Sequence, residues 1–123
     1  MFDRTAQDLN RAFAAFGVRG DVTATDDGVH IPAVTAQALY AKLAYVQGGS
    51  RVPFVRTLLR PSGVEGITLR GDEGLHLRRA LDDIHREDDR RRRIDRGQIP
   101  GALSAAEVSH IARTQPHLFN GRR

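Results

Sequence analysis

The chain has 123 residues, of which 40% are hydrophobic, and it contains no cysteine. This length allows one domain with a core of its own and is short for two, while the lack of cysteine excludes disulfides, thiolate zinc sites and cysteine nucleophiles. The net charge of +4 and the pI near 10.6 favour an anionic partner. Lys42 is the only lysine among 19 basic residues, an arginine bias that we interpret as the codon usage of a high-GC bacterium, or of a phage or plasmid living in one.

The start of the chain and its hydropathy pattern favour an intracellular protein. Met1 to Arg4 lead directly into an amphipathic helix pattern and not into the apolar core of a signal peptide. No apolar run approaches the roughly 20 residues that a helix needs to span a bilayer. We therefore expect a cytoplasmic protein that does not contact a membrane.

The first part of the chain predicts a helix followed by a hairpin. Thr5 and Asp8 have the spacing of a capping box, and apolar residues recur on one face of a helix over residues 6–16. Two β-prone runs follow at residues 21–25 and 28–31. Because an Asp-Gly pair between such runs is typical of a tight turn, we expect these two runs to form a hairpin.

Two helices are expected in the middle of the chain. Thr35 can cap a helix that runs to about residue 46, and Gly48-Gly49-Ser50 would stop it. Residues 51–60 fit either a helix, because Pro53 suits a first helical turn, or a strand. We favour the helix for this run.

Residues 75–97 predict one long helix that begins apolar and ends almost entirely charged. Its first residues, 75–77, also alternate as a strand does. Together with residues 67–70, on the other side of a glycine-containing turn, they predict a second hairpin.

The charged end of the long helix allows two interpretations. Acidic residues at 87, 88 and 89 each precede an arginine by four positions, so the helix can be a solvated element that pairs its own charges. The alternative is a basic surface for a polyanion. Charges that alternate in sign favour the self-paired helix. The residues that would contact phosphates in the alternative are Arg90, Arg91, Arg92 and Arg93.

The end of the chain predicts a linker and a short helix. Ser104 and Glu107 form a second capping box, after which Ile94 of the long helix could pack with Val108 and Ile111. The overall expectation is an α+β fold in one small domain over residues 1–123, with about four to five helices and two short β-hairpins. Its core would span about residues 4–96, and the short helix and tail residues 97–123.

The element order helix, glycine-containing turn, helix and hairpin over residues 34–77 resembles a winged helix-turn-helix DNA-binding domain. In this family the second helix enters the major groove and the hairpin wing contacts the DNA backbone. The resemblance implies that residues 51–60 are the reading helix, and guanidinium groups suit guanine edges and phosphates. The DNA-binding residues implied on this helix, at its start and on the wing are Arg51, Arg56, Thr57, Arg60 and Arg70.

A second resemblance ranks lower. Residues 27–32, followed by a helix, are similar to the strand and helix of swapped-hairpin transition-state regulators. That resemblance implies that residues 52–59 form a strand and that the protein is an intertwined dimer.

Patterns for catalysis are lacking in the sequence. None of the five histidines has the spacing of a helical metal site, Gly48-Gly49 is not followed by the lysine of a phosphate-binding loop, and no serine stands in a nucleophile elbow. We therefore expect a protein that is not an enzyme and has no catalytic residues, metal site or cofactor.

These observations favour a small basic DNA-binding protein that forms a homo-oligomer, such as a transcriptional regulator of a phage, plasmid or high-GC bacterium. The alternative is a protein–protein interaction or assembly subunit, such as a phage structural or host-targeting protein, with no role on nucleic acid. The projecting charged helix and the apolar tail residues Leu118 and Phe119 favour the alternative. A DNA-binding face should hold arginines without acids, as residues 51–60 do and residues 87–93 do not.

Overall fold

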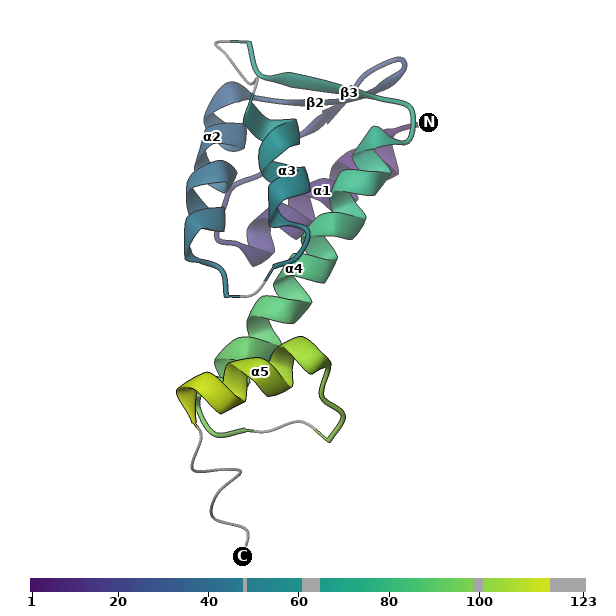
Figure 1. Ribbon diagram of the computed structural model, residues 1–123. Coiled ribbons are helices and arrows are strands. Elements are labelled where there is room, and N and C mark those ends of the chain that lie inside the picture. The colour runs from purple at the N-terminus through teal and green to yellow at the C-terminus, as the bar shows by residue number, and fades with distance from the viewer. Residues whose placement is uncertain (48, 61–64, 99–100, 116–123) are drawn as a thin grey trace, which may run out of the picture.

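A computed structural model describes residues 1–47, 49–60, 65–98 and 101–115 (Figure 1). The expected α+β fold is confirmed, with helices gathered on one side of a small sheet. Within the described residues, no helix is long and apolar enough to cross a membrane. The elements are α1 (Asp3–Ala15), β1 (Thr23–Ala24), β2 (Gly28–Ile31), α2 (Ala33–Lys42), the 3-10 turn η1 (Leu43–Tyr45), α3 (Val52–Leu59), β3 (Ile67–Arg70), α4 (Glu73–Asp95) and α5 (Ala105–Thr114).

The sheet has three antiparallel strands in the order β1-β2-β3. The predicted first hairpin is confirmed, because β1 pairs with β2 across the Asp-Gly turn and Thr23 faces His30. Alternate residues point into the core, as Ile67 and Leu69 do, while Thr68 between them is exposed. The helices α2 and α3 form the connection between the two neighbouring strands β2 and β3.

The predicted second hairpin is wrong. Residues 75–77 belong to the first turns of α4, and the partner of β3 is β2, with Ile31 opposite Ile67. The strand ends at Arg70, and the next residue, Gly71, has a φ of 55° and donates its N–H to the carbonyl of Asp27. Because Leu75 and Leu77 are two residues apart, they satisfy a strand pattern as well as the start of a helical one, and the local sequence could not separate the two.

Two helix starts also differ from the expectation. The helix α1 begins at Asp3, so Thr5 lies inside its first turn and does not cap it, and no side chain caps this helix at Phe2. The helix α2 begins directly after Pro32, and Thr35 is buried with its hydroxyl donating to the carbonyl of Arg19 at 3.4 Å. The helix α2 ends at Lys42. By contrast, the capping box of Ser104 and Glu107 is confirmed at the start of α5.

The core lies between the sheet and the helices, where α1 and the first half of α4 pack side by side (Figure 1). Leu9 and Phe13 of α1 and Leu77 and Leu81 of α4 are fully buried. The second half of α4 extends past this core and carries α5 across its end (Figure 1). Ile94 and Ile111 are buried there, as expected, whereas Val108 is 40% exposed and does not complete the expected trio.

Candidate nucleic-acid interface

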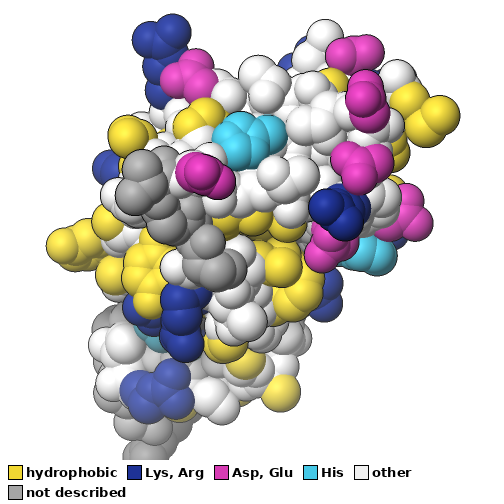
Figure 2. Space-filling view, turned by 90° about the horizontal axis from the view of Figure 1, so that it is seen from above, with side chains coloured by type: hydrophobic (Ala, Val, Ile, Leu, Met, Phe, Trp, Pro, Cys, Tyr) yellow, Lys and Arg dark blue, Asp and Glu magenta, His cyan; other side chains and the backbone are white. Residues whose placement is uncertain are grey.

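The segment that carries α2 and α3 contains no acidic residue. No Asp or Glu occurs between Asp27 and Glu65, although the segment has four basic residues. Figure 2, which looks down on the sheet, shows hydrophobic and basic side chains close together in its lower part, where no acidic side chain is visible. The basic residues of the segment are Lys42, Arg51, Arg56 and Arg60.

The three arginines of α3 and its flanks have no carboxylate partner. Every Asp and Glu of the chain lies within the described residues. None of them forms an ion pair with Arg51, Arg56 or Arg60, although carboxylates pair with most arginines of α4. Three positive charges therefore stand together without local compensation, and such a surface attracts anions.

Arg56 is held by an aromatic ring of the neighbouring helix. Its guanidinium carbon lies 4.8 Å from the centre of the Tyr40 ring, and its Nη2 donates to the Tyr40 hydroxyl at 3.3 Å. Its Nε is buried and has no hydrogen-bond partner among the described residues. The hydrogen bond and the charge of Arg56, assisted by Arg60, lower the pKa of Tyr40 below its ordinary value. Arg56 is therefore half-buried against α2, whereas Thr57, the next residue, is exposed.

The outward surface of α3 combines a cation with exposed apolar groups. Arg51 lies over the ring of Phe54, with its guanidinium carbon 5.8 Å from the ring centre, and Phe54 is 43% exposed. Thr57 donates its hydroxyl proton to the carbonyl of Pro53 at 2.8 Å, so only its oxygen remains to accept a bond from a ligand. Exposed apolar side chains of this size are what a binding surface presents.

Arg70 is not brought together with the arginines of α3. It lies at the end of β3 that leads into α4, and its guanidinium forms an ion pair with Asp27 at 3.5 Å. Its backbone N–H donates to Glu73. Because the predicted wing hairpin does not form in the described residues, Arg70 has no wing to occupy, and the carboxylates around it would repel a phosphate.

The predicted self-pairing of the charged helix is confirmed for three pairs. Arg92 lies 3.0 Å from Asp88 and Arg93 lies 3.0 Å from Asp89, whereas the pair of Arg91 with Glu87 is longer, at 3.9 Å. Asp82 and Arg86 have the same spacing but belong to two other pairs. In these, Arg78 pairs with Asp82, and Arg86 pairs with Asp83.

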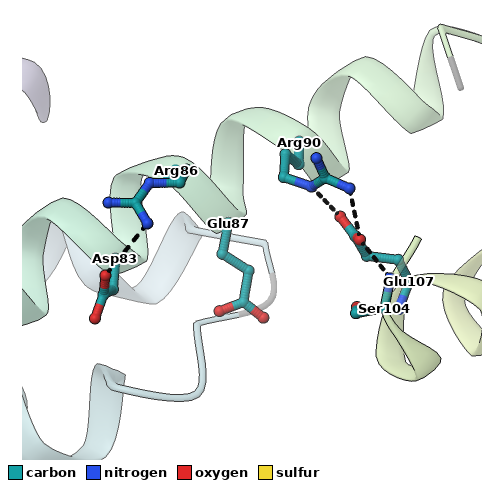
Figure 3. A pocket seen from close by; sticks show the side chains of 6 residues that line it. All are labelled: Asp83, Arg86, Glu87, Arg90, Ser104 and Glu107. Atoms are coloured by element: carbon teal, nitrogen blue, oxygen red, sulfur yellow. Dashed lines mark hydrogen bonds and ion pairs between the residues drawn. The ribbon is translucent and has the colours of Figure 1, made fainter. Parts of the chain in front are cut away.

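Arg90 joins the two last helices. Its guanidinium donates two hydrogen bonds to the Glu107 carboxylate, at 2.5 and 2.8 Å (Figure 3). It donates a further one to the carbonyl of Ala102. Glu107 is only 7% exposed, and the bonds from Arg90 are the main reason why its pKa falls from 4.5 to about 2. The small cavity beside this pair has a volume of about 260 Å³, and the ion pair occupies its wall. With Arg90 engaged as well, all of residues 90–93 have intramolecular carboxylate partners, and their role as phosphate contacts stays a prediction.

The charged part of α4 has a further function that the sequence did not reveal. The carboxylate of Asp88 accepts the backbone N–H of Gln47 at 2.7 Å, and that of Glu87 accepts the N–H of Ser50 at 3.2 Å. Arg92 donates to the carbonyl of Tyr45 at 3.2 Å. These contacts from the charged part of α4 therefore fix the turn between α2 and α3, and with it the position of the arginine-bearing helix α3.

Two further features of the described residues concern metal ligands and cavities. No group of three or more His, Asp and Glu side chains is placed to hold a metal ion among these residues. A second cavity, of about 300 Å³, lies between the end of α1, η1 and α4, where Lys42 and the paired Asp88 and Arg92 line its polar side.

Three comparisons with known proteins bear on identity. No family model, no curated protein and no solved structure matches the chain. Of the two resemblances, the swapped-hairpin regulator requires a strand at residues 52–59, where the structure has the helix α3. The two helices that the winged helix-turn-helix resemblance requires are present as α2 and α3. Its hairpin wing is not formed in the described part, because only the single strand β3 lies between α3 and α4.

The sequence analysis did not identify the aromatic residues on the surface of α2 and α3. Tyr40 holds Arg56, Phe54 carries Arg51, and Tyr45 is 77% exposed at the end of η1. The signal that could have found them is the acid-free run from residue 28 to residue 64, because a segment that excludes one sign of charge is unusual in a chain with 15 acidic residues.

Proposed function

We propose that this protein binds DNA through the outer face of α2 and α3, and that it is not an enzyme. One observation supports the proposal above all. The arginines at 51, 56 and 60 have no carboxylate partner, whereas each of the arginines at 90–93 has one. A guanidinium without a local partner is available to phosphate oxygens, and its binding releases the counterions that surround DNA.

The geometry suits backbone contacts more than base reading. The helix α3 spans only Val52–Leu59, and the hydroxyl proton of Thr57 is already donated to the backbone. Arg51 and Arg60 are exposed near the two ends of this helix, so they can contact successive phosphates along one strand. We therefore propose that affinity comes chiefly from phosphate contacts, with Arg51 and Arg60 among the residues that make them. A regulator of transcription would fit such a module.

A second candidate function rests on a different observation. Three large hydrophobic side chains of the same segment are exposed: Val34 at 79%, Tyr45 at 77% and Phe54 at 43%. An apolar surface of this kind is also typical of protein–protein contacts, and interfaces favour aromatic residues and arginine. The protein would then be an assembly or interaction subunit, or would use this surface to form a homo-oligomer.

The experiment that separates these functions is a titration of labelled duplex DNA with the protein at increasing salt, with the mass in solution measured in the same buffers. We expect binding whose logarithmic affinity falls linearly with the logarithm of the salt concentration and that persists at physiological salt. Loss of all binding at modest salt, together with a stable multimer, would contradict the DNA proposal and favour the assembly function.

A further inference from the structure

Within the α2–α3 face, we propose that Tyr40, Arg56 and Arg60 form one phosphate-binding subsite, whose ligand in the DNA complex is a single backbone phosphodiester. This inference rests on the proposed function for the source of the phosphate. The subsite spans both helices, because Tyr40 belongs to α2 and the two arginines belong to α3 and its C-terminal end.

The first support is that donors from two helices converge on one point. The Arg56 guanidinium lies across the Tyr40 ring and donates to its hydroxyl at 3.3 Å. Arg60 follows Arg56 by four positions and keeps helical backbone angles at the end of α3, so it lies one turn further along the same face of the helix. Two donors, Tyr40 and Arg56, are therefore in direct contact, and a third, Arg60, stands one helical turn away on the same face.

The direction of the hydrogen bond leaves the tyrosine proton free for a ligand. Because the Tyr40 oxygen accepts from Arg56, its own O–H can be donated elsewhere, and no protein acceptor for it is found among the described residues. A phosphate oxygen placed there would receive the hydroxyl proton and guanidinium N–H groups together. Tetrahedral oxygens suit donors that arrive from separate residues, and phosphate is a ligand that arginine recognises well.

The second support is that nothing in the protein neutralises this group. No carboxylate pairs with either arginine among the described residues, and residues 61–64, which follow Arg60, include no acid. Arg56 and Arg60 are also four positions apart on the helix, so their charges repel one another. A bridging anion would offset that repulsion, whereas the arginines of α4 already have carboxylate partners.

The test follows the ring signals of Tyr40 by NMR, because the chain has only two tyrosines and Tyr45→Phe assigns them. The probes are inorganic phosphate, compared with chloride at equal ionic strength, and a duplex DNA of mixed sequence. The variants are Tyr40→Phe and Arg60→Gln, with Arg86→Gln as the control outside the α2–α3 face. We expect both probes to shift the Tyr40 signals in the wild type and in Arg86→Gln, and not in Arg60→Gln.

The DNA affinities of the same variants complete the test. We expect Arg60→Gln to weaken DNA binding by about tenfold, and Tyr40→Phe, which keeps the ring under Arg56 but removes the hydroxyl, to weaken it by about two- to fivefold. Tight DNA binding by all variants with unmoved Tyr40 signals would overturn the subsite and leave the proposed function standing. A phosphate-induced shift at Tyr40 without DNA binding would overturn the phosphodiester assignment and the proposed function together, and would assign the subsite to a free phosphate group.

Discussion

Two regions of this protein, α4 and α3 with its flanking residues, carry ten of the 18 arginines, and they use them in opposite ways. In α4 the guanidinium of Arg90 is bound by a nearly buried carboxylate, and Arg92 and Arg93 pair with acids one turn earlier. In α3 and its flanks, Arg51 lies on an aromatic ring and Arg56 on another, and no carboxylate reaches either one. The denser arginine cluster, in α4, is thus neutralised by carboxylates, whereas the sparser cluster, around α3, remains available to a ligand.

The difference shows that the partners of an arginine, more than the density of arginines, indicate where an anion can bind. A run of four consecutive arginines attracts notice in the sequence, but each paired guanidinium would have to give up a local partner before it could bind a phosphate. The isolated arginines of α3 have no such competition. The acids of α4 serve structure instead, since Glu87 and Asp88 fix the turn that positions α3.

The largest effect is expected from Glu107→Ala in α5, which removes the partner of Arg90 of α4. This change removes a nearly buried carboxylate that binds Arg90 and accepts the N–H of Ser104 at the start of α5. We expect the docking of α5 to lose about 2–3 kcal/mol, measured by amide hydrogen exchange in residues 105–114. Glu65→Ala, at an exposed acid, is the control and should leave this exchange unchanged. Equal exchange in both variants would show that the pair does not hold α5.

The same carboxylate predicts a dependence on pH. Because its pKa is about 2 in the folded protein, below its ordinary value of 4.5, its contribution is complete above pH 4.5 and is lost as the pH falls towards 2. The difference in α5 docking between wild type and Glu107→Ala should be constant from neutral pH down to about 4.5 and then shrink. A difference that stayed constant down to pH 2 would contradict this role of Glu107.

A smaller effect is expected from Asp88→Ala, compared with the same change at its neighbour. Asp88 is 14% exposed and accepts from the Gln47 N–H and from Arg92, whereas Asp89 is 45% exposed and pairs with Arg93. We expect Asp88→Ala to lower the free energy of unfolding by about 1–2 kcal/mol, since it leaves a backbone donor of the turn without its acceptor. Denaturant unfolding of the two variants measures this. Equal losses would mean that the turn does not depend on α4.

The smallest effect is expected from Arg93→Ala, which breaks an exposed pair 3.0 Å long. The free energy of unfolding should fall by only about 0.3–0.5 kcal/mol. DNA affinity should fall only slightly, because the variant loses a single positive charge that lies away from the proposed DNA contacts. A loss of DNA binding as large as that of Arg60→Gln would instead place the ligand on α4 and reverse the comparison between the helices.

Much of the fold could be predicted because it depends on local patterns. The Asp-Gly turn indicated the first hairpin, Pro53 indicated the helix start of α3, and Ser104 with Glu107 indicated α5. The second hairpin was wrong because the partner of β3 is β2, which precedes it by two helices, and no local pattern reports such a pairing.

The candidate site could be predicted only in part, for a similar reason. Its arginines stand out in the sequence, but the contact of Arg56 with Tyr40 joins two helices and depends on how they pack. The pair of Arg90 with Glu107 likewise joins residues on separate helices. Helical spacing could assign Glu87 and Asp88 to their own arginines, yet it could not show that they also hold the turn before α3. The apolar tail at Leu118 and Phe119 lies outside the described residues.

The central claim is that the arginines of α3, and not those of α4, bind DNA. The most direct test is the salt dependence of duplex binding for two charge-matched double variants, Arg51→Gln with Arg60→Gln in the α3 region and Arg86→Gln with Arg93→Gln in α4. We expect the first to reduce the slope of log affinity against log salt by about 2, with an unchanged thermal midpoint, and the second to leave the slope nearly as in the wild type. A larger loss of slope in the α4 variant, or equal losses in both, would contradict the claim.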